Sequence, residues 1–442
     1  IKTAAGDLIK TTPEHPFFTF GIDKLNEVRA DEIKEGESIA IPEIIGLESS
    51  EIEPILMKKV AELNNFICFI TEDMCKKLES SINKRYKDSE NKWAVKNLRE
   101  NINKKRFRIK DLFKIAKILS INEKYIYNNI LRIKNASEGW RVGHTSKPLI
   151  IPRRYNPENL GYLLGCIAGD GHISKTNVIL NNNDKEIQEA YKKYLKEIFE
   201  LESETKKGHT CDITLDNCGT TLARFFTEII GFPKKEKSAK IEVPEIARKN
   251  QEVFRGFLAG LFDTDGYVSP FNNCIEITSK SKKMLQQCAI LLLGFGIQVV
   301  VFEKNEYYTL RIANKIYLTN FVENFKPRLK RKSERIVPAI TKAESSRIFD
   351  FLPLNGQILR ELIVSGKINK KIPYFNKYID SPQLSVQFIQ KTMNNIKINN
   401  ELSIKLQALL EKEIKYIKVT SVKEVANNEE YVYDFTIPET HN

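Results

Sequence analysis

Two segments of the chain share one glycine spacing and end in the same Asp-Gly pair. Each carries glycines nine and five residues before a final aspartate: Gly161 and Gly165 before Asp170, and Gly256 and Gly260 before Asp265. Glycine inside a helix costs about 1 kcal/mol relative to alanine. Four matched glycines therefore predict two helices whose backbones pack very closely. Such a pair would bring the two aspartates together at one end.

The residues around the two segments repeat as well. Asn156, followed by Pro157, and Asn250 are typical N-cap residues that start a helix. After each aspartate the pattern predicts two strands, a helix, two more strands and a final helix. The expected runs are 172–175, 177–180, 185–199, a strand near 204, 212–215 and 220–230 in the first copy, and 266–269, 274–279, 282–295, 298–302, 307–312 and 317–325 in the second. A repeat on this scale predicts two halves of one architecture.

Residues 156–343 resemble the LAGLIDADG homing endonucleases in their single-chain form with two pseudo-symmetric halves. The nonapeptides 163–171 and 258–266 lie at the expected place in matching repeats, and only residues 166–169 depart from the consensus. The resemblance implies a pseudo-twofold αββαββα endonuclease that cuts a long, asymmetric site in double-stranded DNA. An ordinary packed helix pair, in which each Asp-Gly is only a C-cap turn, is the alternative.

The paired aspartates indicate a metal-dependent hydrolysis. Adjacent carboxylates repel each other unless cations lie between them, and hard cations such as Mg²⁺ prefer oxygen ligands. Metal ions at a scissile phosphate stabilise the attacking and leaving oxygens. The resemblance implies that Asp170 and Asp265 are catalytic metal ligands, with Mg²⁺ (or Mn²⁺) as the cofactor. Asp263 fits better a capping or packing role at the helix end.

Family members also place a basic residue near the scissile phosphate in each half. Lys237, within residues 231–238, stands where the resemblance places the first of these. Lys332, within residues 330–333, stands at the matching place in the second half. Both are expected to be catalytic. Lysines that only cover a solvated surface are the alternative.

The two ends of the chain resemble the halves of an intein splicing domain. Residues 5–17 and 30–42 look like its N-terminal half, and residues 431–442 look like a block of its C-terminal half. The resemblance implies that Thr12 and His15 polarise the first peptide bond, that Asp434 assists the early steps and that His441 aids asparagine cyclisation. Taken singly, His15 could be a capped loop residue and Asp434 a solvated acid.

The ends also differ from an intact intein. No cysteine or serine nucleophile begins the sequence, which starts at Ile1. We therefore expect that both splice junctions are missing and that the chain as given cannot splice. The alternative is that His441 and Asn442 form the terminal pair of the intein.

Composition agrees with a nucleic-acid partner. The net charge is +13, from 70 basic and 57 acidic residues, and a basic excess attracts phosphates. Seven cysteines without paired spacing indicate reduced thiols rather than disulfides or a zinc site. No apolar stretch reaches membrane-spanning length. These features predict a cytoplasmic protein that binds DNA. The resemblance implies a monomer whose partners are the DNA of the intein-less allele of the host gene and flanking exteins in cis.

A helix-turn-helix is expected within residues 48–155. Apolar residues at helical spacing predict helices 111–119 and 123–133 around a turn at 120–122. The side chains expected to contact DNA are Arg106, Arg108, Tyr125, Tyr127, Asn128, Asn129 and Arg132. A plain helical hairpin that packs on the endonuclease is the alternative. A mostly helical segment, 346–412, is expected to contact DNA or to serve as a connector.

These features predict an α+β multidomain protein. An all-β, Hint-like splicing domain is expected from residues 1–47 and 413–442. Residues 48–155 would recognise DNA, 156–345 would form the LAGLIDADG homing endonuclease, and 346–412 a helical extension. The expected function is intein-encoded, site-specific DNA cleavage within an autocatalytic protein-splicing element. The alternative is a DNA-binding or splicing-only intein with an inactive nuclease.

Overall fold

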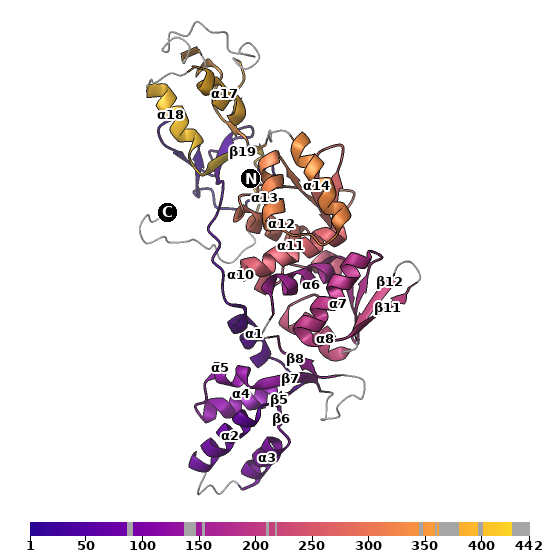
Figure 1. The fold of residues 1–442 in the computed structure, drawn as a ribbon. Helices are drawn as coiled ribbons and strands as arrows, with labels where there is room; N and C mark the ends of the chain where they lie inside the picture. Colours follow the sequence, from indigo (N-terminus) through magenta and orange to yellow (C-terminus); the bar gives the residue numbers. More distant parts are fainter. Residues whose placement is uncertain are drawn as a thin grey trace. The chain divides into compact units, whose positions relative to one another are not determined.

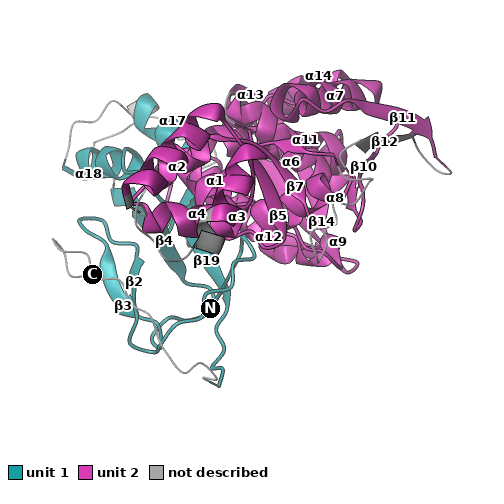
Figure 2. Ribbon diagram, turned by 90° about the horizontal axis from the view of Figure 1, so that it is seen from below, with its two compact units in different colours: residues 1–41, 347–442 teal, residues 42–346 magenta. Residues whose placement is uncertain are grey.

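The computed structural model describes most of the chain and resolves it into two compact units. The described residues are 1–85, 92–136, 147–152, 155–208, 212–216, 219–343, 348–358, 360–361, 380–396 and 401–426. One unit comprises Ile1–Ile41 and Arg347–Asn442, and the other comprises Pro42–Ser346 (Figure 2). The two ends of the chain therefore contribute to the same unit. No helix in the described ranges is long and apolar enough to cross a membrane.

The first unit is built on a sheet that joins both ends of the chain. Its five strands run in the order β1-β19-β4-β2-β3. Their bounds are β1 Lys2–Thr3, β2 Pro16–Thr19, β3 Asn26–Arg29, β4 Ser38–Pro42 and β19 Ile414–Ser421. β1 and β19 are antiparallel, with Lys2 opposite Ser421. Residues more than 400 positions apart in the sequence thus share one ladder.

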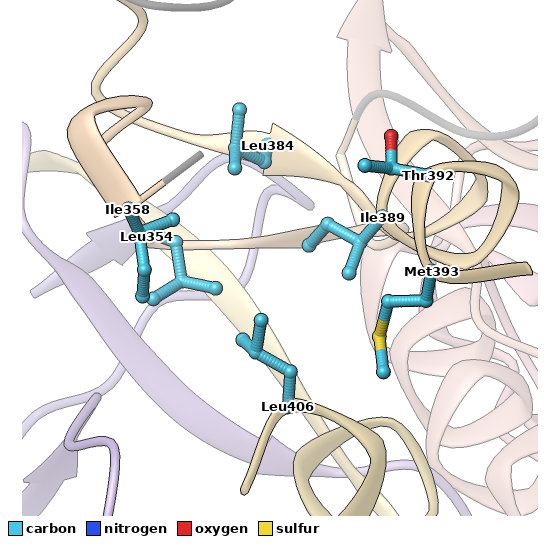
Figure 3. Close-up of a pocket in the computed structure, with 7 residues that line it drawn as sticks. All are labelled: Leu354, Ile358, Leu384, Ile389, Thr392, Met393 and Leu406. Atoms are coloured by element: carbon cyan, nitrogen blue, oxygen red, sulfur yellow. The ribbon is translucent and has the colours of Figure 1, made fainter. Parts of the chain in front are cut away.

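Helices complete this unit. A two-stranded antiparallel sheet of β17 (Phe351–Leu352) and β18 (Leu384–Ser385) precedes α17 (Val386–Ile396) and α18 (Glu401–Leu410). Leu384, Ile389 and Leu406 are buried in a common apolar cluster with Tyr416 of β19. Apolar side chains surround a small pocket here, with Thr392 as the polar exception (Figure 3). Both helices lie within residues 346–412, where a helical extension was expected, and the all-β splicing domain expected from residues 1–47 and 413–442 is not confirmed.

The second unit contains two halves of identical topology. The first half has strands β9 Gly171–Ile173, β10 Val178–Asn181, β11 Ser203–Lys207 and β12 Asp212–Asp216, and the second has β13 Gly266–Ser269, β14 Cys274–Ser279, β15 Val300–Lys304 and β16 Tyr307–Ala313. The sheet orders are β9-β10-β12-β11 and β13-β14-β16-β15. Each half therefore places its strands in the order first, second, fourth, third, which confirms the internal repeat.

Helices surround the two sheets in the same order. The first half contains α6 Pro157–Gly169, α7 Lys185–Phe199 and α8 Thr220–Arg224, which continues as a π-helical segment, Phe225–Ile229. The short helices α9 Lys237–Lys240 and α10 Glu245–Lys249 follow, and the second half contains α11 Gln251–Asp265, α12 Lys282–Leu293, α13 Lys315–Asn324 and α14 Lys330–Lys342. The predicted helices begin within two residues of the observed ones.

The two halves meet along α6 and α11, which lie side by side (Figure 1). The side chains of Asn156 and Asn250 cap them, accepting hydrogen bonds from the backbone N–H groups of Glu158 at 2.8 Å and Val253 at 3.0 Å. A Cβ atom on Gly161 would lie 2.0 Å from the Val253 carbonyl oxygen. A Cβ atom on Gly256 would lie 1.9 Å from the Glu158 carbonyl oxygen. Only glycine permits this backbone contact, as the repeated spacing predicted.

An α/β region precedes the two halves within the same unit. Its helices are α1 Ile52–Ala61, α2 Glu72–Arg85, α3 Lys92–Asn103, α4 Ile109–Ile118 and α5 Glu123–Asn128. Its sheet has the order β6-β5-β7-β8, with β5 Phe66–Ile70, β6 Arg106–Arg108, β7 Ile130–Asn135 and β8 Leu149–Ile150. The region is therefore built around a sheet and not around a pair of helices.

The expected helix-turn-helix is wrong in its second element. The predicted helix 123–133 ends at Asn128, and residues 130–135 form the strand β7. Ile130 and Ile133 are both buried although they are three positions apart, which mimics a helical period. The register of β7 against β5 shifts at Phe69/Ile70, so one extra residue separates the two inward-facing isoleucines. Tyr127, expected on DNA, is fully buried instead.

Candidate functional site

Asp170 and Asp265 lie at the touching ends of the paired helices. Asp170 is the C-cap of α6, and Asp265 is the last residue of α11. The helix ends are close, because a Cβ atom on Gly169 would lie 2.2 Å from the Thr264 hydroxyl oxygen and 3.1 Å from Asp265 Oδ2. The fold thus brings together the two acidic residues that the duplicated sequence singled out.

Burial dominates the electrostatics of these acids. Burial, followed by the Asp170 carboxylate, raises the pKa of Asp265 to about 6. The pKa of Asp170 is also raised by burial, against the hydrogen bond that its Oδ2 accepts from Asn182 Nδ2 at 2.6 Å. Lys237 and Lys332 favour the ionised form of both acids. Two carboxylates held this way form a site for added positive charge.

Lys237 caps the end of α6. Its Nζ donates hydrogen bonds to the carbonyl oxygens of Ile167, Ala168 and Gly169 at 2.6, 2.8 and 3.1 Å. The last carbonyls of a helix lack partners within it and form the negative end of its dipole. Burial lowers the pKa of Lys237 to about 8, so the ammonium form still prevails at neutral pH. Its three N–H groups are then all used on the helix end.

Lys332 does the same for α11. Its Nζ lies 2.8, 2.7 and 3.4 Å from the carbonyl oxygens of Phe262, Asp263 and Thr264. The side chain is buried, and burial lowers its pKa. The two lysines named from sequence are therefore equivalent in the structure, each holding the turn that presents one aspartate. Their catalytic role stays a prediction, and their geometry is that of positioning residues.

Asp263 links several elements behind the site. Its Oδ2 accepts hydrogen bonds from the Tyr162 hydroxyl at 2.8 Å and from the backbone N–H groups of Arg328 at 2.6 Å and Leu329 at 3.3 Å. Tyr162 belongs to α6, and the other two residues precede α14, which carries Lys332. Asp263 thus has the packing role expected of it. No sequence signal pointed to Tyr162, Arg328 or Asn182, because each is recognised only by its partner in space.

The predicted splicing residues are described in part. Thr12 and His15 lie in one tight turn, in which the His15 backbone N–H donates to the Thr12 carbonyl oxygen at 3.3 Å. The His15 ring is exposed and meets the Phe17 ring edge-on, with 5.6 Å between their centres. Asp434 and His441 lie outside the described residues. The structure therefore places Thr12 and His15 in one turn, and the splicing roles of all four residues stay predictions.

The residues expected on DNA do not form one helical surface. Tyr125 and Asn128 are on α5, whereas the three arginines are on the sheet. Arg106 and Arg132 are the neighbours of Phe69 on its two sides, so they share one face. Arg108 lies two positions from Arg106 in β6 and is on the same face. Their contact with DNA stays a prediction.

Arg224 makes a contact that the sequence did not reveal. Its guanidinium stacks on the Phe66 ring, 4.2 Å from its centre, and donates to the Asn64 carbonyl oxygen at 2.8 Å. It also bridges to Glu228 at 2.7 Å. Arg224, in α8 of the first half, thereby fixes the start of β5. The α/β region consequently packs on the first of the two halves, although as a sheet and not as a helical hairpin.

Both chain ends share one sheet in the first unit, and the second unit, with its two halves, is inserted between them. The chain belongs to the intein splicing domain family, which matches residues 1–442. It is 28% identical over 430 residues to the probable translation initiation factor IF-2 of Methanocaldococcus jannaschii, covering 93% of this chain and 34% of that protein. It is 24% identical over 458 residues to elongation factor 2 of Methanopyrus kandleri, covering 100% of this chain and 35% of that protein.

The chain spans about a third of the length of these curated relatives. Among solved structures, the homing endonuclease I-DmoI in complex with DNA and Mn resembles 39% of this chain and 97% of its own, with 17% identity and a TM-score of 0.31.

Proposed function

We propose that this intein carries a site-specific endonuclease that cuts both strands of the intein-less allele of its host gene. The observation that supports it most is the pair Asp170 and Asp265 at the abutting ends of α6 and α11, each end capped by a buried lysine. The excess of basic residues favours a polyanionic substrate. Two halves with equal topology and different side chains suit a long asymmetric site, bound by a monomer.

The acids fit a divalent cation of the Mg²⁺ type. Within the described ranges no group of three histidine, cysteine or acidic side chains could hold a metal ion by itself. Mg²⁺ commonly binds through one or two carboxylates and takes its other ligands from water and phosphate. Asp170 and Asp265 would hold it. Mg²⁺ or Mn²⁺ bound there would stabilise the charge that develops on the phosphate oxygens during hydrolysis.

The remaining side chains set the position of these acids. Asn182 fixes one carboxylate oxygen of Asp170 by a 2.6 Å hydrogen bond. Lys237 and Lys332 neutralise the carbonyl ends of their helices and lower the cost of keeping two acids ionised side by side. Arg106, Arg108, Arg132, Tyr125 and Asn128 are proposed to contact the DNA backbone outside the cleaved region.

Membership of the family supports splicing as the second activity. We propose that Thr12 and His15 act at the N-terminal junction, and Asp434 and His441 at the later steps, with the exteins attached in cis. Matches confined to about a third of each relative are expected of a segment carried inside a host protein. The two activities then act on different molecules. The splicing part removes the element from the host protein, and the nuclease part acts on the host gene.

The direct test is cleavage of a plasmid that carries the uninterrupted insertion site. With Mg²⁺ the protein is expected to convert the plasmid to one linear product, and with EDTA to leave it intact. A plasmid with the element already inserted is the control, and it should resist cutting because the site is interrupted. A folded protein that leaves the first plasmid uncut with Mg²⁺ and Mn²⁺ would sink the nuclease proposal and leave splicing or DNA binding alone.

A second prediction concerns stability without metal. Since the folded state raises the pKa of Asp265 to about 6, it binds the proton more tightly than the unfolded chain does. This acid therefore makes folding less favourable as the pH rises through about 4 to 6, and the penalty persists at pH 7. Asp265→Asn removes this penalty, which is worth about 1 kcal/mol of unfolding free energy after discounting for solvent screening. The substitution should therefore raise the melting temperature of the metal-free protein by about 2 °C.

Mg²⁺ should make the wild type the more stable of the two proteins. Adding Mg²⁺ is expected to stabilise the wild type by mass action and to leave Asp265→Asn unchanged. Glu189→Gln, which neutralises an exposed acid on α7, is the matched control and should keep the wild-type response. Differential scanning calorimetry at pH 7, with and without Mg²⁺, measures both effects. An Asp265→Asn protein that is less stable without metal and still gains from Mg²⁺ would contradict the proposed site.

A further inference from the structure

The two faces of the sheet in the second half carry different side chains. Ile275 and Ile277 of β14, with Leu310 and Ile312 of β16, are fully buried on the face that packs on the helices. Side chains alternate along a strand, so Glu276 and Arg311 lie on the opposite face. They stand directly opposite each other in the ladder of β14 and β16.

Arg311 is fixed there from two sides. Its Nε donates a 2.8 Å hydrogen bond to Glu276 Oε1, and its Nη2 is 2.6 Å from the same oxygen. The guanidinium carbon lies 4.6 Å from the centre of the Phe302 ring. The Arg311 side chain is still 37% exposed, against 20% for Glu276. An arginine held by a carboxylate and an aromatic face is oriented before any ligand arrives.

The N–H groups of Arg311 that Glu276 does not use are suited to recognising guanine. A guanidinium has five N–H groups, and Glu276 takes one from Nε and one from Nη2. One N–H on Nη2 and two on Nη1 are left, along the outer edge of the group. Two adjacent donors in one plane match the O6 and N7 acceptors of guanine in the major groove, which is the commonest specific contact of arginine with DNA.

In the described ladder of the first half, no charged pair stands at the equivalent positions. Its β9-β10-β12-β11 register places Ile179 and Leu215 at the positions that Glu276 and Arg311 occupy in the second half. An apolar pair cannot donate hydrogen bonds to a base edge, and it suits a different base. The two halves therefore differ in the residues at these equivalent ladder positions, although their folds agree.

We propose that Arg311 is a specificity-determining residue that reads one guanine in the part of the DNA target bound by the second half, with Glu276 and Phe302 as the residues that orient it. The proposal rests on the nuclease function proposed for the paired aspartates. It assigns the guanine to one half only, so it also makes the target asymmetric.

The test measures cleavage of a set of DNA duplexes in which each position of the uninterrupted insertion site is changed in turn. The wild type should require guanine at one position by about ten- to a hundredfold. Arg311→Ala should lose that preference and keep the preferences at all other positions. Lys304→Ala, an exposed basic residue on the edge strand β15, is the control, and it should lower cleavage of every duplex alike.

A chemical change in the DNA tests the same contact in the wild-type protein, without any substitution in the chain. Replacing the guanine by 7-deazaguanine removes the N7 acceptor, and it should slow wild-type cleavage by about tenfold. The same replacement should have no effect on Arg311→Ala, and a reduced effect on Glu276→Gln. Arg311→Lys keeps the charge and should recover cleavage without the full preference.

The outcomes separate the two proposals. If the wild type cuts no duplex, the nuclease function fails. If it cuts with clear preferences that Arg311→Ala leaves unchanged, or relaxes at every position equally, the nuclease function stands and the assignment of Arg311 is overturned.

Discussion

Asp170→Asn and Asp265→Asn are each expected to slow cleavage of the insertion-site plasmid by at least about a thousandfold, while the affinity for the same DNA stays within a few fold. Each aspartate supplies one of the two carboxylates at the junction of α6 and α11. A bound metal contributes several kcal/mol to stabilising charge in the transition state, and each 1.4 kcal/mol is a factor of about ten in rate.

The expected loss is large because neighbouring groups offer no substitute. Within the described residues, no third acid joins these two to form a metal-binding cluster. Asparagine keeps the shape of the side chain and one oxygen, so the contact between the helices should survive. Removing one of two adjacent negative charges also leaves attraction to the DNA phosphates undiminished. Binding and cleavage should therefore separate.

The measurement compares single-turnover cleavage in Mg²⁺ with a gel-shift titration in Ca²⁺, for both variants and for the wild type. Glu189→Gln is again the matched control, since it removes one acidic charge from an exposed position of the same unit. It should cut at close to the wild-type rate. A rate within tenfold of the wild type for either aspartate variant would show that the paired acids are not the catalytic site.

Local sequence signals were enough to predict the paired helices and most of the elements between and after them. Asn156 and Asn250 cap the helices they were expected to cap, and α7 occupies residues 185–199 as its apolar period predicted. Caps and periods are properties of short stretches, so they can be recognised without knowing the fold. To predict that Asp170 and Asp265 lie close together, only one tertiary assumption was then needed, namely that the two helices pack through their glycines.

The errors arose where the outcome depends on a distant partner. Ile130 and Ile133 have a helical spacing, and only the shifted register against β5 makes them neighbours on one face of a strand. The acceptors of Lys237 are carbonyls almost 70 positions away in sequence. The sequence could place a lysine near each aspartate, but it could not show that the ammonium group is used to cap a helix.

Alanine at Gly161 or Gly256 is expected to destabilise the unit by at least about 3 kcal/mol, which corresponds to roughly 6 °C or more in melting temperature. In an isolated helix the same change is favourable by about 1 kcal/mol, so the sign of the effect identifies its cause. The new Cβ would lie 2.0 Å from the Val253 carbonyl oxygen in one variant and 1.9 Å from that of Glu158 in the other. Both obstacles are backbone atoms, which cannot rotate away.

Gly46→Ala provides the matched control, because nothing lies within 4 Å of its added Cβ. It should leave the melting temperature unchanged or raise it slightly. Thermal and denaturant unfolding of the three variants measures the difference. Helices pushed apart by a methyl group also separate Asp170 from Asp265, so the Mg²⁺-dependent stabilisation should disappear together with the packing. Equal stability of Gly161→Ala and Gly46→Ala would mean that the helices do not approach this closely. The proposed metal site shared by Asp170 and Asp265 would then be contradicted as well.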